Sequence, residues 1–317
     1  MSSLTKKYEK VYKGIIRPYR ETYSVSELGP DLFEISGKTF TRRDFSLKNQ
    51  RNLNIQCSFY TQSVPIILPC VIYLHTYNSS RLEALPILPV LLPSNINVLT
   101  LDFSGSGNSD GEFISLGWHE REDLQTVVNY LRTEGKTTCI GLWGKGTGAV
   151  TALLFADRDP SIGGMVLDSP FLSLRLLSEE KLQKHCNLPG FIKNTAIQFI
   201  RNSILKSAQF DVNDLNTLEH VVHTFIPCIF CRALNDDFIG PAHLTDLFQS
   251  YPGEKKLVTF EGTHNSRRPS YFLDSVAIFF YNCLLCETIE LPHCTIENPP
   301  INNKENKPDS DDSYELL

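Results

Sequence analysis

Polar and apolar residues alternate over residues 52–59, where Asn and Gln or Ser occupy the even positions and apolar side chains the odd ones. This period of two is typical of a β-strand with one buried face, and a second strand near residues 38–47 is expected to pair with it. Further along, short apolar runs without alternation predict strands buried on both faces in the middle of a parallel sheet. These runs are residues 71–75, 98–103, 138–143, 165–168, 227–231 and 256–260.

Helical patterns lie between these runs. The clearest spans residues 121–132, where apolar residues recur at i, i+3, i+4 and i+7 from Leu124. Acidic residues at its start and Gly135 beyond its end fit the helix dipole and a left-handed stop. Because strands and helices alternate throughout, the sequence predicts an α/β fold with a mostly parallel, doubly wound sheet.

Two segments fall outside this alternation. Residues 171–223 are expected to form a mainly helical insertion over the C-terminal edge of the sheet, where ligands of such folds bind. Residues 288–317 contain prolines, many Asn and Asp and almost no apolar side chains, which predicts a disordered acidic tail. The expected organisation is an N-terminal arm over residues 1–37, a main domain over residues 38–287 that includes the insertion, and this tail.

Composition narrows the class of protein. The 317 residues carry 30 Lys and Arg against 36 Asp and Glu, a net charge of −6 that argues against nucleic acid as a partner. No transmembrane segment is expected, since the most apolar run, residues 82–93, is short and broken by three prolines. The first twenty residues lack the apolar core of a secretory signal, so the protein is expected to be cytoplasmic. Nine cysteines, an odd number, favour reduced buried thiols over a disulfide framework.

The most informative stretch is residues 140–149, IGLWGKGTGA, which places Gly144, Gly146 and Gly148 between a strand and a helix. Three glycines there are able to cradle phosphate, but the run matches neither GxGxxG nor GxxxxGK[ST]. The other interpretation is a nucleophile elbow, G-x-S-x-G, in which small flanking residues let a strained turn pack closely. Gly146 then stands at the nucleophile position, so the hydroxyl that would attack a carbonyl is missing.

With this elbow the chain resembles the α/β-hydrolase superfamily, in its serine-aminopeptidase-like branch. The similarity covers about residues 15–285 and rests on six marks in the expected order. They are VIYLHTYNSS at 71–80, LDFSGSGNS at 101–109, GLWGKGTG at 141–148, VLDSPF at 166–171, LNDDFI at 234–239 and FEGTHNS at 260–266. The resemblance implies a mostly parallel central sheet with helices on both faces and a small helical cap, with no cofactor and no metal.

The resemblance also implies which catalytic residues remain. The family's acid lies in a D-x-x-[IV] pattern that matches Asp236, with Asp237 as the alternative, and its base lies in a Gly-x-His-Asn loop that matches His264. In an active member the Asp orients the imidazole and the His deprotonates the serine. The acid and the base are therefore present, and the nucleophile is not.

A second departure affects the oxyanion hole. The family reads His-Gly-Asn after its first central strand, whereas this chain reads His75-Thr76-Tyr77. A β-branched Thr76 restricts the loop, and Tyr77 puts a ring where a small polar group stands in the family. The expected oxyanion donors are the backbone N–H groups of Thr147 and Tyr77, and His75 is expected to brace the loop.

Several roles stay open at this site. Thr147 lies one position late to replace the serine, on the first helical turn, where its side chain is expected to point away from His264. Water activated by His264 and Asp236 in the space vacated at Gly146 is chemically permissible, with the loss of covalent catalysis. Asp236 and His264 are equally interpretable as a buried hydrogen-bonded pair that holds two loops together.

Paired cysteines and the C-terminal tail contain short motifs with less specific meaning. C-x-x-C patterns at residues 228–231 and 283–286 resemble a four-thiolate zinc site, but residues three apart on a strand face opposite sides, which favours buried thiols. In the tail, residues 304–306 resemble a destruction-box triplet and residues 316–317 end an acidic dileucine sorting signal. Patterns this short arise by chance in polar tails.

Two functions follow from these observations. The first is a pseudoenzyme of α/β-hydrolase fold that binds an acyl or small apolar ligand under the insertion, or a protein partner. The alternative is a weak or unconventional hydrolase that acts on an ester, thioester or peptide bond through Asp236 and His264. The changes at Gly146 and at Thr76-Tyr77 favour the inactive protein, because they are independent losses. A module that works mainly through its tail is a third hypothesis.

Overall fold

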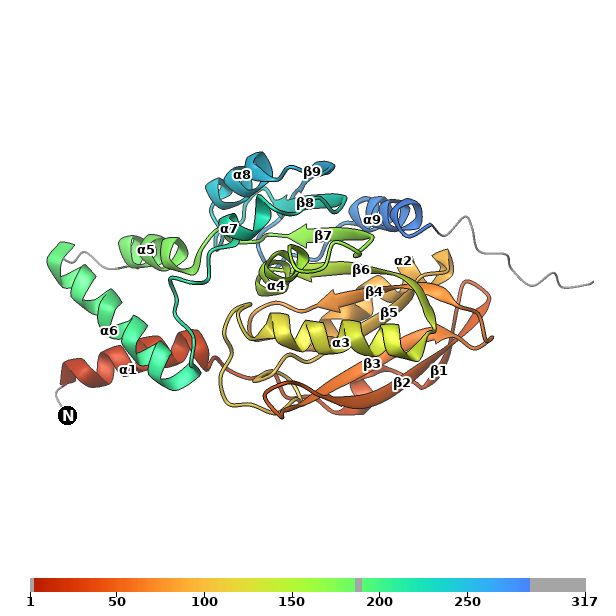
Figure 1. Ribbon diagram of the computed structural model, residues 1–317, viewed down its shortest axis with the longest axis horizontal. Coiled ribbons are helices and arrows are strands. Elements are labelled where there is room, and N and C mark those ends of the chain that lie inside the picture. The colour runs from red at the N-terminus through yellow and green to blue at the C-terminus, as the bar shows by residue number, and fades with distance from the viewer. Residues whose placement is uncertain (1–2, 186–189, 286–317) are drawn as a thin grey trace, which may run out of the picture.

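One nine-stranded sheet forms the centre of the computed structural model, which describes residues 3–185 and 190–285 (Figure 1). The strands are β1 (Leu32–Ile35), β2 (Lys38–Lys48), β3 (Asn54–Gln62), β4 (Leu68–Leu74), β5 (Asn97–Leu101), β6 (Thr137–Lys145), β7 (Gly164–Asp168), β8 (Cys228–Ala233) and β9 (Lys255–Phe260). Their order is β1-β2-β3-β5-β4-β6-β7-β8-β9. Pairing is antiparallel from β1 to β5 and parallel from β5 to β9, which confirms the mostly parallel sheet.

Helices cover both faces of this sheet, as the alternation of strands and helices predicts. One face carries α3 (Glu120–Glu134), α4 (Thr147–Ala156), α7 (Thr217–Val221) and α8 (Pro241–Ser250). The other face carries η2 (Arg81–Ile87), α2 (Leu88–Leu91), η3 (Leu92–Ser94) and α9 (Ser270–Cys283). Each layer buries its own apolar cluster against the sheet. At the end of α3, Gly135 is left-handed with φ 63°, which confirms the predicted stop.

The strand predictions succeed in the interior and fail at the edges. The five runs between residues 71 and 231 coincide with the buried strands β4 to β8, and β2 pairs with β3 as expected. The run over residues 256–260 was expected to be buried on both faces, which is wrong. It belongs to β9, which ends the sheet and has a neighbouring strand on one side only, so that Leu257 is 49% exposed. The four-residue β1, with the sequence LFEI, alternates between exposed and half-buried side chains, but its polar and apolar residues do not alternate, and the sequence analysis does not predict it.

Three further helices lie beyond the C-terminal ends of the parallel strands. Between β7 and β8 the chain forms α5 (Leu174–His185) and α6 (Gly190–Ala208) before α7. The N-terminal helix α1 (Ser3–Ile16) packs against α6, and the two lie side by side at one end of the molecule (Figure 1). η1 (Val25–Leu28) follows on the way to the sheet. A third apolar cluster joins α1, α5 and α6 to the core, which the sequence does not predict for α1.

Thiols and surface charge add no further site. The six cysteines that the structure describes are free, and Cys228 and Cys231 enter opposite apolar clusters, as their spacing on β8 predicts. Within residues 3–185 and 190–285, no group of three or more His, Cys, Asp or Glu is placed to hold a metal.

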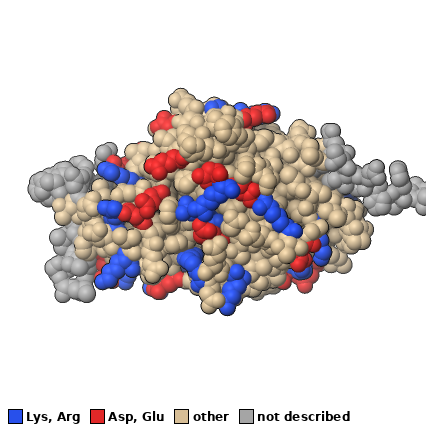
Figure 2. All heavy atoms as spheres, in the orientation of Figure 1, with Lys and Arg blue, Asp and Glu red and all other residues tan. Residues whose placement is uncertain are grey.

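Figure 2 shows acidic and basic side chains interspersed on the visible face. None of the described helices combines the length and apolarity needed to cross a bilayer. The predicted tail lies outside the described residues.

Candidate functional site

A sharp turn joins β6 to α4, with Gly146 at its centre. Gly146 has φ 53° and ψ −114°, a conformation that L side chains rarely adopt, and its N–H donates to the carbonyl of Asp168 at 2.7 Å. The flanking glycines permit close packing. A Cβ on Gly144 would lie 2.4 Å from the carbonyl carbon of Gly148, and one on Gly148 would lie 2.0 Å from the carbonyl oxygen of Leu74. The strand, turn and helix thus have the close packing of a nucleophile elbow, with no side chain at the apex.

Asp236, after β8, and His264, after β9, meet beside this turn. His264 Nδ1 lies 2.8 Å from Asp236 Oδ2, and their side chains are 9% and 1% exposed. Asp236 Oδ1 accepts from the N–H groups of Phe238 and Ile239 at 2.9 and 2.8 Å. Burial by itself raises the pKa of Asp236, but these hydrogen bonds outweigh it, and the pKa lies below its ordinary value. A carboxylate therefore holds the imidazole by Nδ1. Asp237, the alternative acid, is exposed at the edge of the cavity described below.

The histidine loop is fastened to the elbow by a buried ion pair that the sequence analysis missed. Arg268 donates from Nε and Nη2 to the carboxylate of Asp168 at 2.6 and 2.9 Å, and from Nη1 to the carbonyls of His264 and Ser266. Burial lowers the pKa of Arg268, yet the charge of Asp168 outweighs it and raises that pKa. Since Gly146 donates to the backbone of Asp168, one residue connects the two halves of the site.

The loop after β4 is held by its backbone. Thr76 N–H donates to Glu83 Oε2 at 2.7 Å, and Glu83 Oε1 accepts from Lys145 Nζ at 2.8 Å. His75 braces the loop from the other side, with Nδ1 2.8 Å from the Thr76 carbonyl and Nε2 accepting from Phe103 N–H at 3.1 Å. The backbone position of Thr76 is therefore fixed by charged and aromatic neighbours.

Tyr77 lines the cavity described below together with Gly146 and His264, and its side chain also reaches the N-terminal helix. Its hydroxyl donates to the carbonyl of Gly14 on α1, and burial raises its pKa to about 12. The side chain thus fastens the N-terminal helix. Neither Tyr77 N–H nor Thr147 N–H, the two expected oxyanion donors, finds a protein acceptor within the described part of the chain.

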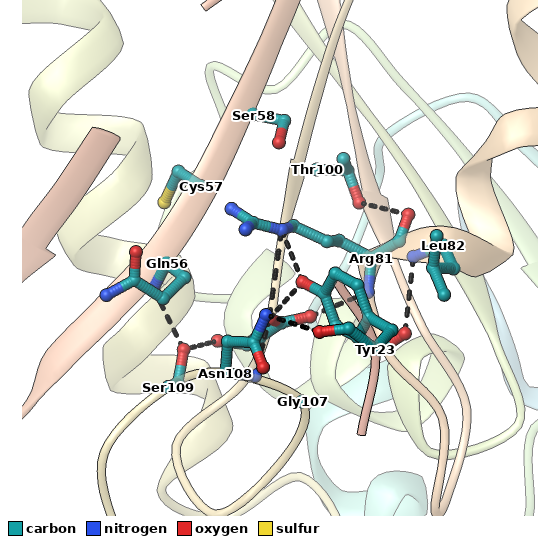
Figure 3. A network of polar contacts seen from close by, with 12 residues as sticks. Tyr23, Gln56, Cys57, Ser58, Arg81, Leu82, Thr100, Gly107, Asn108 and Ser109 are labelled. Carbon is teal, nitrogen blue, oxygen red and sulfur yellow. Dashed lines mark hydrogen bonds and ion pairs between the residues drawn. The ribbon is translucent and has the colours of Figure 1, made fainter. Parts of the chain in front are cut away.

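Buried polar groups secure the segment that leads from α1 to the sheet. Asp102 accepts from Arg81 N–H at 2.8 Å and from Tyr23 hydroxyl at 2.6 Å. The Tyr23 hydroxyl in turn accepts from Arg81 Nε at 2.5 Å (Figure 3). Burial raises the pKa of Tyr23 well above its ordinary value. Arg20 adds hydrogen bonds to backbone carbonyls of residues 106–111. These contacts hold the N-terminal segment in place and leave α1 over the site.

A cavity of about 560 Å³ lies between this turn and the helices α1, α5 and α6. Its walls are mainly apolar. Thr76, Thr147 and His264 line it at the elbow, and Arg175, Lys181 and Arg201 line it on α5 and α6. The apolar walls include Ile15, Phe171, Leu174, Ile200, Ile204 and Ile239. The cavity therefore has the composition of a site for a small, mainly apolar molecule that carries a polar group.

The space beside Gly146 is partly filled by the side chain of Thr76. A Cβ on Gly146 would lie 2.2 Å from Thr76 Oγ1, 3.4 Å from Thr76 Cβ and 3.9 Å from His264 Nε2. The hydroxyl of Thr76 stands where a side chain at position 146 would begin. The sequence analysis weighed Thr76 only as a restriction on its loop, because no local signal connects residues 70 positions apart.

Comparisons with known proteins show which families this chain is similar to. The family model described as serine aminopeptidase, S33, matches residues 69–197. The chain is 29% identical over 205 residues to the uncharacterized protein YqkD of Bacillus subtilis, covering 61% of this chain and 64% of that protein. It is 25% identical over 175 residues to Protein ABHD12B of Homo sapiens, covering 53% of this chain and 48% of that protein. The matched regions thus span about half to two thirds of these relatives.

Solved structures show the same fold. The esterase Pf2001 of Pyrococcus furiosus superposes with a TM-score of 0.63 at 20% identity, covering 84% of this chain and 97% of that one. An acetyl xylan esterase from Paenibacillus sp. R4 gives 0.62 at 16% identity, with coverage of 80% and 87%. Together with the mostly parallel sheet and the turn after β6, these findings show that the chain has the α/β-hydrolase fold and that residues 69–197 match the serine aminopeptidase family model.

Proposed function

We propose that this protein binds an acyl or small apolar ligand in the cavity above Gly146 and is a pseudoenzyme with respect to serine-hydrolase chemistry. The observation that carries the proposal is an apolar cavity of about 560 Å³ whose polar end has an acid–base pair but no serine. A concave space of this size suits a small molecule better than a protein partner. We include in the proposal that residues 171–223 act as a cap, together with α1.

The polar end gives a bound ligand its orientation. His264 Nε2 and the N–H groups of Thr147 and Tyr77 have no protein partner among the described residues, so they are available to a carbonyl or similar group. The apolar walls then receive the rest of the molecule. Each buried methylene contributes about 0.8 kcal/mol, so the Kd should fall about fourfold per added methylene until the cavity is full.

The test is equilibrium binding of straight-chain alcohols of increasing length, measured by calorimetry. Ile200→Trp fills the cavity from α6 and should abolish binding. Ile278→Trp makes the same change on α9 at a side chain that is 63% exposed and outside the cavity, so its Kd should match the wild type. A Kd that does not depend on chain length, or that Ile200→Trp leaves unchanged, would exclude this cavity as the binding site.

One observation favours the alternative of residual hydrolysis. Asp236 and His264 are hydrogen bonded at 2.8 Å, and His264 Nε2 is turned toward the elbow. In this alternative the pair acts as a general base. Turnover of a short-chain ester that disappears in His264→Ala would support it, and equal turnover in both proteins would count against it.

A further inference from the structure

The hydroxyl of Thr76 occupies the place of the missing nucleophile. Oγ1 lies 2.2 Å from the point at which a Cβ on Gly146 would stand, and His264 Nε2 lies 3.9 Å from the same point. A serine hydroxyl would extend a further bond length from that Cβ. The site therefore contains an aliphatic hydroxyl at the elbow, supplied by the loop after β4 in place of position 146. We infer that Thr76 is the nucleophile of a residual acyl-transfer reaction at this site.

The surroundings of Thr76 leave only its side chain free to react. Its N–H is taken by Glu83 Oε2, and its carbonyl accepts from His75 Nδ1. Oγ1 has no hydrogen-bond partner within residues 3–185 and 190–285. Because threonine is β-branched and has few χ1 rotamers, a fixed backbone also restricts where this hydroxyl points.

A base lies near the same point. His264 is held through Nδ1 by the Asp236 carboxylate, which leaves Nε2 as the nitrogen that faces the elbow. No protein donor or acceptor in the described structure occupies that nitrogen. Hydrogen bonds between nucleophile and base are often long before substrate binds and tighten afterwards, so the inference requires Thr76 Oγ1 and His264 Nε2 to come together when the substrate binds.

Two unpaired amides are available for the oxyanion. Thr147 N–H begins α4, where the positive end of the helix dipole lies, and Tyr77 N–H follows Thr76 directly. Both residues line the cavity. Donors of this kind stabilise the negative charge that develops when a carbonyl is attacked.

The reaction follows from these positions. Thr76 Oγ1 attacks the carbonyl carbon of an apolar acyl ester, its proton passes to His264 Nε2, and the carbonyl oxygen takes the negative charge. When the carbonyl re-forms, the ester C–O bond breaks, and His264 protonates the departing alcohol. The acyl group is then on Thr76. Water attacks the acyl-threonine with transfer of a proton to His264, and His264 passes that proton to Thr76 Oγ1 as the C–O bond to Thr76 breaks and the acid leaves.

The experiment compares wild type, Thr76→Val and Thr76→Ser with 4-nitrophenyl butyrate and with an alkyl fluorophosphonate, whose fluoride Thr76 would displace. Peptide mass spectrometry locates the adduct. We expect slow turnover and an adduct on Thr76 in the wild type. Thr76→Val keeps the shape, removes the hydroxyl and should reduce both signals to background. Thr76→Ser should retain them, and His264→Ala should lower the rate at least about 100-fold.

Controls separate this inference from a structural effect. Thr245→Val makes the same substitution on the exposed part of α8, outside the cavity, and should behave as the wild type. An unlabelled wild type, an adduct on another residue, or turnover that survives Thr76→Val would overturn the inference. So would loss of the adduct in Thr147→Val but not in Thr76→Val.

The inference rests on the proposed function, because the acyl chain must enter the same cavity. Alcohol binding is therefore measured on the same proteins. Binding without any Thr76 adduct would overturn this inference and leave the proposed function standing. Absence of alcohol binding would overturn the proposed function, and a Thr76 adduct formed without such binding would show that Thr76 reacts independently of the apolar cavity.

Discussion

A serine placed at position 146 should not by itself restore a serine hydrolase. The backbone there has φ 53° and ψ −114°, where a residue with a Cβ is strained by about 1–3 kcal/mol. The new Cβ would also lie 2.2 Å from Thr76 Oγ1, whereas ordinary contacts begin at 3.4 Å. Overpacking of this kind costs about 1–3 kcal/mol. Gly146→Ser should therefore lose about 2–6 kcal/mol of unfolding free energy, a large part of the total for a typical domain.

The steric overlap between a side chain at position 146 and Thr76 Oγ1 can be measured separately from the backbone strain, because the Thr76 backbone is fixed and cannot move away. Its backbone is bound to Glu83 and His75, so relief requires removal of the side chain. In a double-mutant cycle with Thr76→Gly, the strain stays and the overlap disappears. The cycle should give a favourable coupling of about 1–3 kcal/mol between the two substitutions.

Urea unfolding of the wild type, the two single variants and the double variant gives their free energies of unfolding. Fluorophosphonate labelling of the same proteins shows which residue reacts. The double variant Thr76→Gly/Gly146→Ser should be labelled at position 146, whereas Thr76→Gly alone should not be labelled at all. Gly146→Ser with wild-type stability, or additive free energies in the cycle, would refute the steric reasoning. Labelling of the single Gly146→Ser variant at position 146 would refute it as well.

Three further outcomes follow from the contacts around the site. Arg268→Gln leaves the buried carboxylate of Asp168 unpaired and should cost about 3–5 kcal/mol in urea unfolding; a loss below about 1 kcal/mol would mean that the pair is dispensable. Burial raises the pKa of Asp236, whereas hydrogen bonds from His264 and two amides lower it, and the net change is a decrease. Its stabilising contribution is thus present above the unfolded-state pKa of about 3.9 and is lost as pH falls through the folded-state pKa, so Asp236→Asn should flatten the acid limb of stability against pH; an unchanged limb would contradict this. Tyr77→Phe removes the bond to Gly14 and should cost about 0.5–1.5 kcal/mol, seen as faster hydrogen exchange in α1 with no change in α9; unchanged exchange in α1 would argue against the tether.

The sequence alone determined the features that depend on local chain chemistry. Continuous apolar runs are found as the buried strands β4 to β8, since such runs are stable only between two covering layers. The spacing of Gly144, Gly146 and Gly148 identified a turn in which neighbouring backbones touch. Asp236 and His264 were identified by the motifs around them, and the structure brings the two side chains together, while their roles stay predictions.

Only the tertiary structure decided how distant loops meet. Three features join residues that follow different strands or helices. They are the close approach of Thr76 to Gly146, the ion pair of Arg268 with Asp168 and the position of α1 over the cavity. Periodicity reports which face of an element is buried, but not which loop lies opposite. That information depends on the order of strands in the sheet, which places β4 beside β6 and so sets the hydroxyl of Thr76 against the apex of the elbow.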